Sequence, residues 1–167
     1  MPKRLLERCQ PNSVREFRLA AQQRFRDALV LAPQGHGTGA IYLWGYAAEM
    51  TLKAAYFHAI GFRPRQIISL ADLKGAKASA ASLGFQWTGN NLHSVESWAR
   101  LLVTTRAKLP GLAYATQAFA NEVVARAGVF QILWRETLRY HKNVAYSHEV
   151  VQIRAAAEWF LLNSSQL

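Results

Sequence analysis

Residues 38–61 read TGAIYLWGYAAEMTLKAAYFHAIG, a segment that is apolar almost all the way round yet carries one acid and one base, Glu49 and Lys53. Its large apolar residues recur at spacings of three and four, which is typical of an α-helix. A helix that is apolar on every side belongs in the middle of a helical bundle. Because burying an unpaired charge is costly, this buried polar pair must satisfy itself, reach a partner chain or line a site.

The segments on either side of this central helix also have helical patterns. Ser13 and Glu16 have the spacing of a capping box and begin a helix that we expect to end near Ala32, before Pro33. Gly61 is expected to end the central helix. Further helices are predicted over residues 67–83, 92–109, 112–140 and from Ser147 onward, with Gly128 allowing a bend or a close helix contact in the long fifth one.

No segment alternates with the period of a strand, so the predicted fold is all-α, an up-and-down bundle of five or six helices. The length of 167 residues fits one domain. We therefore predict a flexible N-terminal segment over residues 1–12 and a single helical domain over residues 13–167.

Composition narrows the classes of protein. Half of the residues are hydrophobic (51%) and 18% are charged, which excludes a disordered chain, and Glu49 and Lys53 interrupt the longest apolar stretch before it could span a bilayer. The first residues lack the apolar core of a secretory signal. The one cysteine, Cys9, cannot form an internal disulfide. These features lead us to expect a cytoplasmic protein with no membrane association.

The chain is strongly basic, with a formal net charge of +10 from 20 Lys and Arg against 10 Asp and Glu. Residues 1–35 hold seven of the bases and three of the acids, residues 36–110 eight and three, and residues 111–167 five and four. Such a surface favours RNA or an acidic protein as a partner, although charge alone does not specify which.

The central segment also resembles a protein family. Residues 40–54, AIYLWGYAAEMTLKA, resemble the same block of HEPN (higher eukaryotes and prokaryotes nucleotide-binding) domains, and weaker similarities follow at His93–Glu96, at Trp134–Tyr140 and in the last helix. The resemblance implies a helical bundle that works as a homodimer in a toxin–antitoxin or defence system. It also implies one of two partners, RNA or a nucleotidyltransferase-type protein.

The same resemblance directs attention to residues 139–148, RYHKNVAYSH. HEPN ribonucleases use an arginine followed four to six residues later by a histidine, because metal-free RNA cleavage needs a base and a cation that holds the phosphate. Here Arg139 has eight residues between it and His148, whereas Lys142 has the family's spacing but lacks the planar fork of arginine. A diverged catalytic site would use His148 and Arg139. Alternatively, Arg139 and Lys142 neutralise a helix end and His148 is an exposed first-turn residue.

Arg135, Arg139 and Lys142 follow helical spacing toward the segment that holds His141 and Tyr146. This stripe is the predicted nucleic-acid-binding surface, made by Arg135, Lys142, His141 and Tyr146, and the outer face of the first helix, with Arg15, Arg18 and Arg26, competes with it. Residues 35–39, GHGTG, precede a helix and could cradle a phosphate, but a plain interhelical loop is the favoured interpretation. The five histidines follow no metal-binding spacing, so we expect neither a metal site nor a cofactor.

Two functional hypotheses remain. The first is an RNA-binding HEPN-like protein, which would be a diverged metal-independent endoribonuclease if Arg139 and His148 act together. The second is a non-catalytic interaction module that partners a nucleotidyltransferase-type protein. The incomplete motif favours the second hypothesis, and the charge of +10 favours the first.

Overall fold

The computed structural model describes residues 4–5, 9–89, 91–114 and 116–167. Of the segment predicted to be flexible, residues 1–3 and 6–8 lie outside the described residues. The helices of the described part are α2 (Val14–Leu31), α3 (Gly37–Ala59), α4 (Leu70–Ser82), α5 (Val95–Lys108), α6 (Gln117–Leu133) and α7 (Ser147–Leu162), with short 3-10 helices η1 (Ala32–Gln34) and η2 (Glu136–Tyr140).

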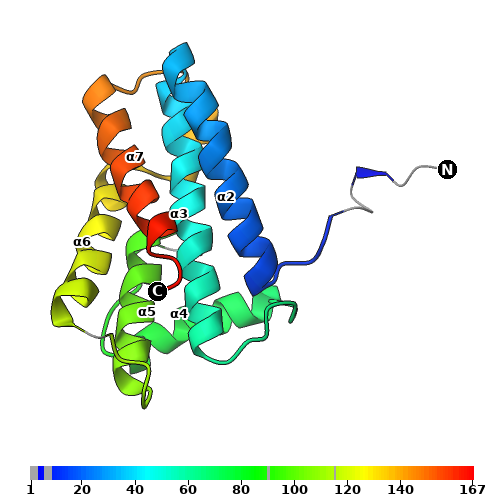
Figure 1. Ribbon diagram of the computed structural model, residues 1–167, viewed down its shortest axis with the longest axis vertical. Coiled ribbons are helices and arrows are strands. Elements are labelled where there is room, and N and C mark those ends of the chain that lie inside the picture. The colour runs from blue at the N-terminus through cyan, green and yellow to red at the C-terminus, as the bar shows by residue number, and fades with distance from the viewer. Residues whose placement is uncertain (1–3, 6–8, 90, 115) are drawn as a thin grey trace.

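These helices form an all-α bundle, as the sequence predicted. Figure 1 shows α2, α3 and α7 running side by side, with α5 and α6 behind and below α7 and with α4 lying across the foot of α3. Helix α3 contacts α2, α5 and α7, so it occupies the centre of the bundle. No helix of the described residues combines the length and the apolar character that a membrane span requires.

The apolar surface of α3 explains its central position. Trp44, Ala48 and Leu52 are fully buried, and most other residues of the same helix are buried too. Helices α2, α4, α5, α6 and α7 each contribute side chains to the same core cluster. The core is therefore continuous through the bundle, and α3 touches it with nearly every turn.

Capping residues set several helix ends. Ser13 Oγ accepts a hydrogen bond from Glu16 N (3.2 Å), which begins α2 where the sequence predicted. Helix α4 begins at Leu70 instead of residue 67 because Ser69 and Asp72 form a capping box. Helix α5 begins at Val95 instead of residue 92 because Ser94 is its cap.

The long helix predicted over residues 112–140 is wrong. Helix α6 ends at Leu133, and Trp134 has an extended backbone (φ −134°, ψ 138°) before the chain forms η2. The predicted inner residues Phe130 and Trp134 are nevertheless buried. Gly128 makes no close helix contact, since a Cβ at this position would meet nothing within 4 Å.

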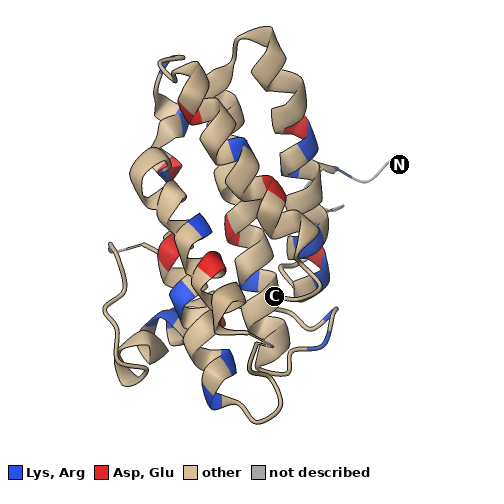
Figure 2. Ribbon diagram, turned by 60° about the vertical axis from the view of Figure 1, so that its left-hand side comes forward, with Lys and Arg blue, Asp and Glu red and all other residues tan. Residues whose placement is uncertain are grey.

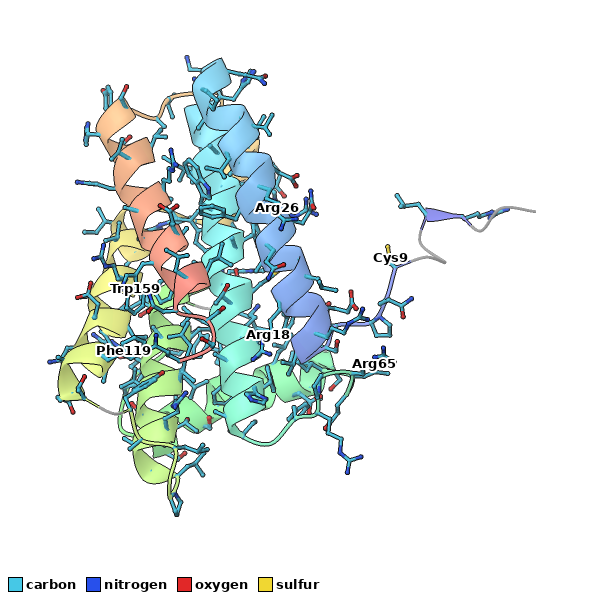
Figure 3. The ribbon with its side chains drawn as sticks, in the orientation of Figure 1. Cys9, Arg18, Arg26, Arg65, Phe119 and Trp159 are labelled. Carbon is cyan, nitrogen blue, oxygen red and sulfur yellow. The ribbon has the colours of Figure 1, made fainter. Side chains whose placement is uncertain are left out.

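Charged side chains are distributed over several helices of the bundle, as Figure 2 shows. On α2, Arg15, Arg18 and Arg26 are exposed, and Figure 3 shows Arg26 pointing away from the bundle. Figure 3 also shows Phe119 of α6 beside Trp159 of α7, whose ring centres are 5.4 Å apart. The basic residues of α2 are thus one exposed face among several.

Candidate functional site

Glu49 and Lys53 lie one turn apart on α3, and both side chains are buried. The Lys53 ammonium donates a hydrogen bond to Glu49 Oε1 and lies 5.3 Å from the centre of the Trp98 ring. His93, from the segment before α5, places its Nδ1 3.1 Å from both carboxylate oxygens of Glu49. The two charges therefore satisfy each other, and His93 joins them. We call Glu49, Lys53 and His93 the buried trio.

The segment that carries His93 is held by tryptophan side chains. Trp87 Nε1 donates to the backbone oxygen of Asn91 (3.0 Å), and Trp98 Nε1 donates to that of Leu92 (2.9 Å). The His93 N–H donates to Asn91 Oδ1 (3.0 Å). Because these bonds fix the backbone from Asn91 to His93, a defined loop directs the ring at Glu49.

The contact with Glu49 determines the chemistry of His93. An ionised carboxylate only accepts hydrogen bonds, so Nδ1 must carry the proton and Nε2 is the ring atom left for another partner. The hydrogen bond to Glu49 raises the pKa of His93, and it outweighs burial, which lowers it. The His93 side chain is 36% exposed, so a proton bound to its ring would place the charge of the buried trio near the surface.

An aromatic wall lies beside the buried trio. Tyr46 meets His93, Tyr42 and Trp134 edge-on, with ring centres 5.8, 5.0 and 5.4 Å apart. Burial raises the pKa of Tyr46, and a hydrogen bond with Tyr42 adds to the effect. Trp134 Nε1 donates to the backbone oxygen of Tyr42 (3.0 Å), and its indole occupies the space above Gly45, where a Cβ would lie 1.9 Å from that nitrogen. The missing side chain of Gly45 thus makes room for Trp134.

A cavity of about 390 Å³ opens next to this wall, between the segment that carries His93 and the end of α6. We call it the polar cavity. Phe130 and Trp134 form part of its lining. The polar and charged side chains in its lining include Thr88, Asn91, His93, Glu96, Arg135 and Glu136.

The carboxylates of the polar cavity have partners within the protein, whereas its arginine has none among the described residues. Glu96 Oε1 lies 2.9 Å from Arg100 Nη2, so its charge is neutralised from the same helix. Glu136 Oε1 accepts a hydrogen bond from Asn91 Nδ2 (2.5 Å). The guanidinium of Arg135 has no hydrogen bond or ion pair within the described part of the chain. Arg135 is therefore the cation available to a bound molecule, and a protonated His93 would supply a second.

Residues 135–148 cover the connection from α6 to α7 and the first two residues of α7, and they hold all six residues that the sequence predicted for catalysis or nucleic-acid binding. We call them the basic loop. The Arg139 guanidinium lies 4.7 Å from the centre of the Tyr140 ring. The rings of Tyr146 and His148 are nearly parallel (9°), with centres 5.8 Å apart. Tyr140 is 72% exposed and Tyr146 69%, so both rings present a free face.

The basic loop is tied to the start of α3. Asn143 Oδ1 accepts a hydrogen bond from Thr38 N (2.9 Å), and Asn143 Nδ2 donates to the backbone oxygen of Gly35 (2.6 Å). Thr38 Oγ1 accepts from the N–H groups of Val144 (2.8 Å) and Ala145 (3.0 Å). These bonds hold residues 143–145 of the basic loop against the start of α3.

These bonds also bear on whether residues 35–39, GHGTG, could cradle a phosphate. The N–H of Thr38 in the first turn of α3 is occupied by Asn143, and a Cβ at Gly37 would lie 2.9 Å from Val150. Protein atoms thus fill the place that a phosphate would need, which favours a plain interhelical loop. Within the described ranges, no three His, Cys, Asp or Glu side chains are grouped to hold a metal ion.

The structure does not bring Arg139 and His148 together. Each is in a pair with its own tyrosine, and among the described residues no hydrogen bond or ion pair joins the two. Arg135, Arg139 and Lys142 do not share a helical stripe, because Arg135 precedes η2 and Lys142 follows it. Arg135 instead lines the polar cavity, whereas His141 and Lys142 are exposed in the connection to α7.

His93 is the site residue that sequence reasoning did not single out. Its one signal was the similarity of His93–Glu96 to the HEPN pattern, which did not indicate that the ring contacts Glu49. Comparison with protein families, with characterised proteins and with solved structures finds no match. The basic loop and the polar cavity are therefore the features of the described residues that indicate a function.

Proposed function

We propose that this chain is a HEPN-like protein that binds single-stranded RNA through the basic loop. The observation that carries the proposal is the pair of exposed tyrosines, Tyr140 and Tyr146, each stacked with a cationic or titratable neighbour. Aromatic faces stack on RNA bases without regard to sequence, and neighbouring cations attract the phosphates. Both kinds of group are present along the loop, a combination typical of proteins that bind single strands.

Two further features support this proposal. The hydrogen bonds between Asn143 and the start of α3 order the basic loop before any ligand arrives, which lowers the entropy cost of binding. Arg135, Arg139 and Lys142 are all exposed and supply phosphate contacts. In this proposal the protein works as a cytoplasmic homodimer of a toxin–antitoxin or defence system, and two copies of the loop share one cleft.

Binding without cleavage is the activity that we propose, because Arg139 and His148 occupy separate stacked pairs. The test is fluorescence anisotropy with a labelled oligouridylate, followed by electrophoresis of the same RNA after incubation with EDTA. We expect salt-sensitive binding and intact RNA. Metal-independent cleavage that disappears in His148→Ala would instead support a diverged endoribonuclease.

A second candidate function has its own observation. Ile132 (83% exposed) and Val144 lie at a hollow of about 200 Å³ between α3, α6, the start of α7 and the basic loop. Exposed apolar side chains around a hollow favour a protein partner. The alternative proposal is therefore a non-catalytic interaction module that binds a nucleotidyltransferase-type protein. Co-purification of such a partner, lost in Ile132→Glu and accompanied by no RNA binding, would favour it.

A further inference from the structure

The polar cavity adjoins the basic loop, and residues 135–137 belong to both. We propose that this cavity binds the terminal phosphate of the RNA strand whose bases stack on the basic loop. The inference rests on the proposed function for the source of the phosphate. The recess itself is a separate feature, since it is also built from the start of α5, from the segment before α5 and from the end of α6.

The charge of the polar cavity favours an anion. The carboxylate of Glu49 is already bonded by Lys53, so a protonated His93 leaves the buried trio with one positive charge in excess. His93 carries that charge to the wall of the polar cavity. Arg135 adds a second cation that has no ion-pair partner among the described residues. Two available cations in one recess favour an anion with more than one negative charge.

The charge and the acceptor oxygens of an anion decide how well it fits these cations. A terminal phosphate monoester has a second pKa near 6, carries a charge of about −1.5 to −2 at pH 7 and offers three acceptor oxygens. A phosphodiester within the strand carries one charge. An imidazolium Nε2–H and an arginine fork are donors with no acceptor function, so they match the monoester and form charge-assisted hydrogen bonds with it.

The carboxylates in the wall of the polar cavity would repel a phosphate if they were free. Glu96 is neutralised by Arg100 at 2.9 Å, and Glu96 Oε2 also accepts a hydrogen bond from Thr88 Oγ1 (3.2 Å). Glu136 is bonded by the Asn91 amide. With both carboxylates occupied, the cations decide the sign of the recess. Its volume of about 390 Å³ has room for one terminal nucleotide.

The inference includes a dependence on pH, because only the protonated ring donates from both nitrogens. The charged groups around His93 are Glu49 and Lys53 from α3 and Glu136 from η2, with the Tyr46 ring edge-on. The net effect of these groups and of burial raises the pKa of His93, so protonation extends to higher pH than for a free imidazole. Phosphate affinity should fall as pH rises through that folded-state pKa.

The test compares oligouridylates of equal length that carry a 5′-phosphate, a 3′-phosphate or hydroxyl ends, by fluorescence anisotropy at pH 6 and pH 8. We expect one phosphorylated end to bind at least about tenfold more tightly than the hydroxyl form at pH 6, which corresponds to about 1.4 kcal/mol. His93→Gln keeps a donor for Glu49 but cannot be protonated, and it should lose the preference while binding hydroxyl-ended RNA as the wild type does. Lys142→Ala is the matched control, and it should weaken all three RNAs and retain the preference.

A second readout separates failure of this inference from failure of the proposed function. Ribose 5-phosphate is titrated into the protein while the His93 ring is followed by NMR, with ribose as the control. Saturable shifts with the phosphorylated sugar alone would support the cavity as a phosphate site, even for a protein that binds no RNA, and would identify a free phosphorylated molecule as its ligand. No saturable shift of the His93 ring, or equal binding of the three RNAs by a protein that does bind RNA, would overturn the inference.

Discussion

The contact between Gly45 and Trp134 yields the sharpest prediction, because a single added methyl group tests it. A Cβ at Gly45 would lie 1.9 Å from Trp134 Nε1 and 2.1 Å from two further indole atoms. Such distances cannot be relieved by shifts of a few tenths of an ångström. Since Gly45 lies inside α3, the indole must leave its place against the helix.

The magnitude follows from two opposing effects. Removing a buried tryptophan ring costs about 3–5 kcal/mol. Replacing glycine by alanine inside a helix gains about 1 kcal/mol. We therefore expect Gly45→Ala to lower the free energy of unfolding by about 2–4 kcal/mol, a large share of the roughly 5–15 kcal/mol of a typical domain. Part of the loss is the hydrogen bond from Trp134 to Tyr42.

The assay is urea denaturation followed by circular dichroism, with two comparison variants. Gly128→Ala is the matched control, because Gly128 also lies inside a helix but its Cβ would meet nothing within 4 Å, so stability should stay equal or rise by up to about 1 kcal/mol. In the double variant Gly45→Ala with Trp134→Leu, the smaller side chain should remove the clash. The double variant should therefore lose less unfolding free energy than the sum of the losses in the two single variants. Equal stability of Gly45→Ala and Gly128→Ala would refute the reasoning.

Three further predictions concern the core, the basic loop and the buried trio. Leu52→Asp should leave the domain unfolded in circular dichroism, because Leu52 is fully buried and an unpaired carboxylate there costs several kcal/mol; an unchanged melting temperature would contradict this. Replacing Arg135, Arg139 and Lys142 together with alanine should weaken RNA binding. The slope of the logarithm of the binding constant against the logarithm of the salt concentration should become shallower by about one for each lost phosphate contact. Identical salt titrations of folded wild type and variant would count against the basic loop as the RNA-binding surface. Because the folded-state pKa of His93 is raised, the stability that its contact with Glu49 contributes is fully present below the unfolded pKa near 6.5 and is lost as pH rises through the folded value. The urea midpoint of the wild type should therefore fall across that window relative to the midpoint of His93→Gln. Parallel midpoints would exclude the contact as a source of stability.

The sequence predicted those parts of the fold whose causes are local. The hydroxyl of Ser13 caps α2, and the apolar residues of α3 repeat at helical spacing, so both helices and the hairpin between them could be inferred from neighbouring residues. Helix α7 begins at Ser147, as predicted. Even the inward direction of Trp134 followed from its place in the stripe.

What the sequence could not predict depends on contacts between distant segments. Helix α6 ends before Trp134 because the indole fits above Gly45, a residue about ninety positions earlier in the chain. Periodicity continues through this break, so it indicated a longer helix. It also directed attention to Gly128, although the helix glycine whose Cβ would clash with an indole ring is Gly45.

The candidate site divides in the same way. The exposed cations and tyrosines of the basic loop were visible in the sequence, because they lie close together along the chain. The polar cavity was not, since it joins Arg135 with His93 and Glu96 from a separate segment. Only the fold shows that the acid and base of α3 hold a histidine at the wall of a recess.

The hydrogen bonds of Thr38 have a consequence for local unfolding. Its N–H is bonded to Asn143, and its hydroxyl receives the N–H groups of Val144 and Ala145, so three amides from segments more than a hundred residues apart depend on the same small junction. Lifting the loop would release all three at once and fray the first turn of α3. These amides should therefore exchange their hydrogens with solvent at a common rate, as one cooperative unit.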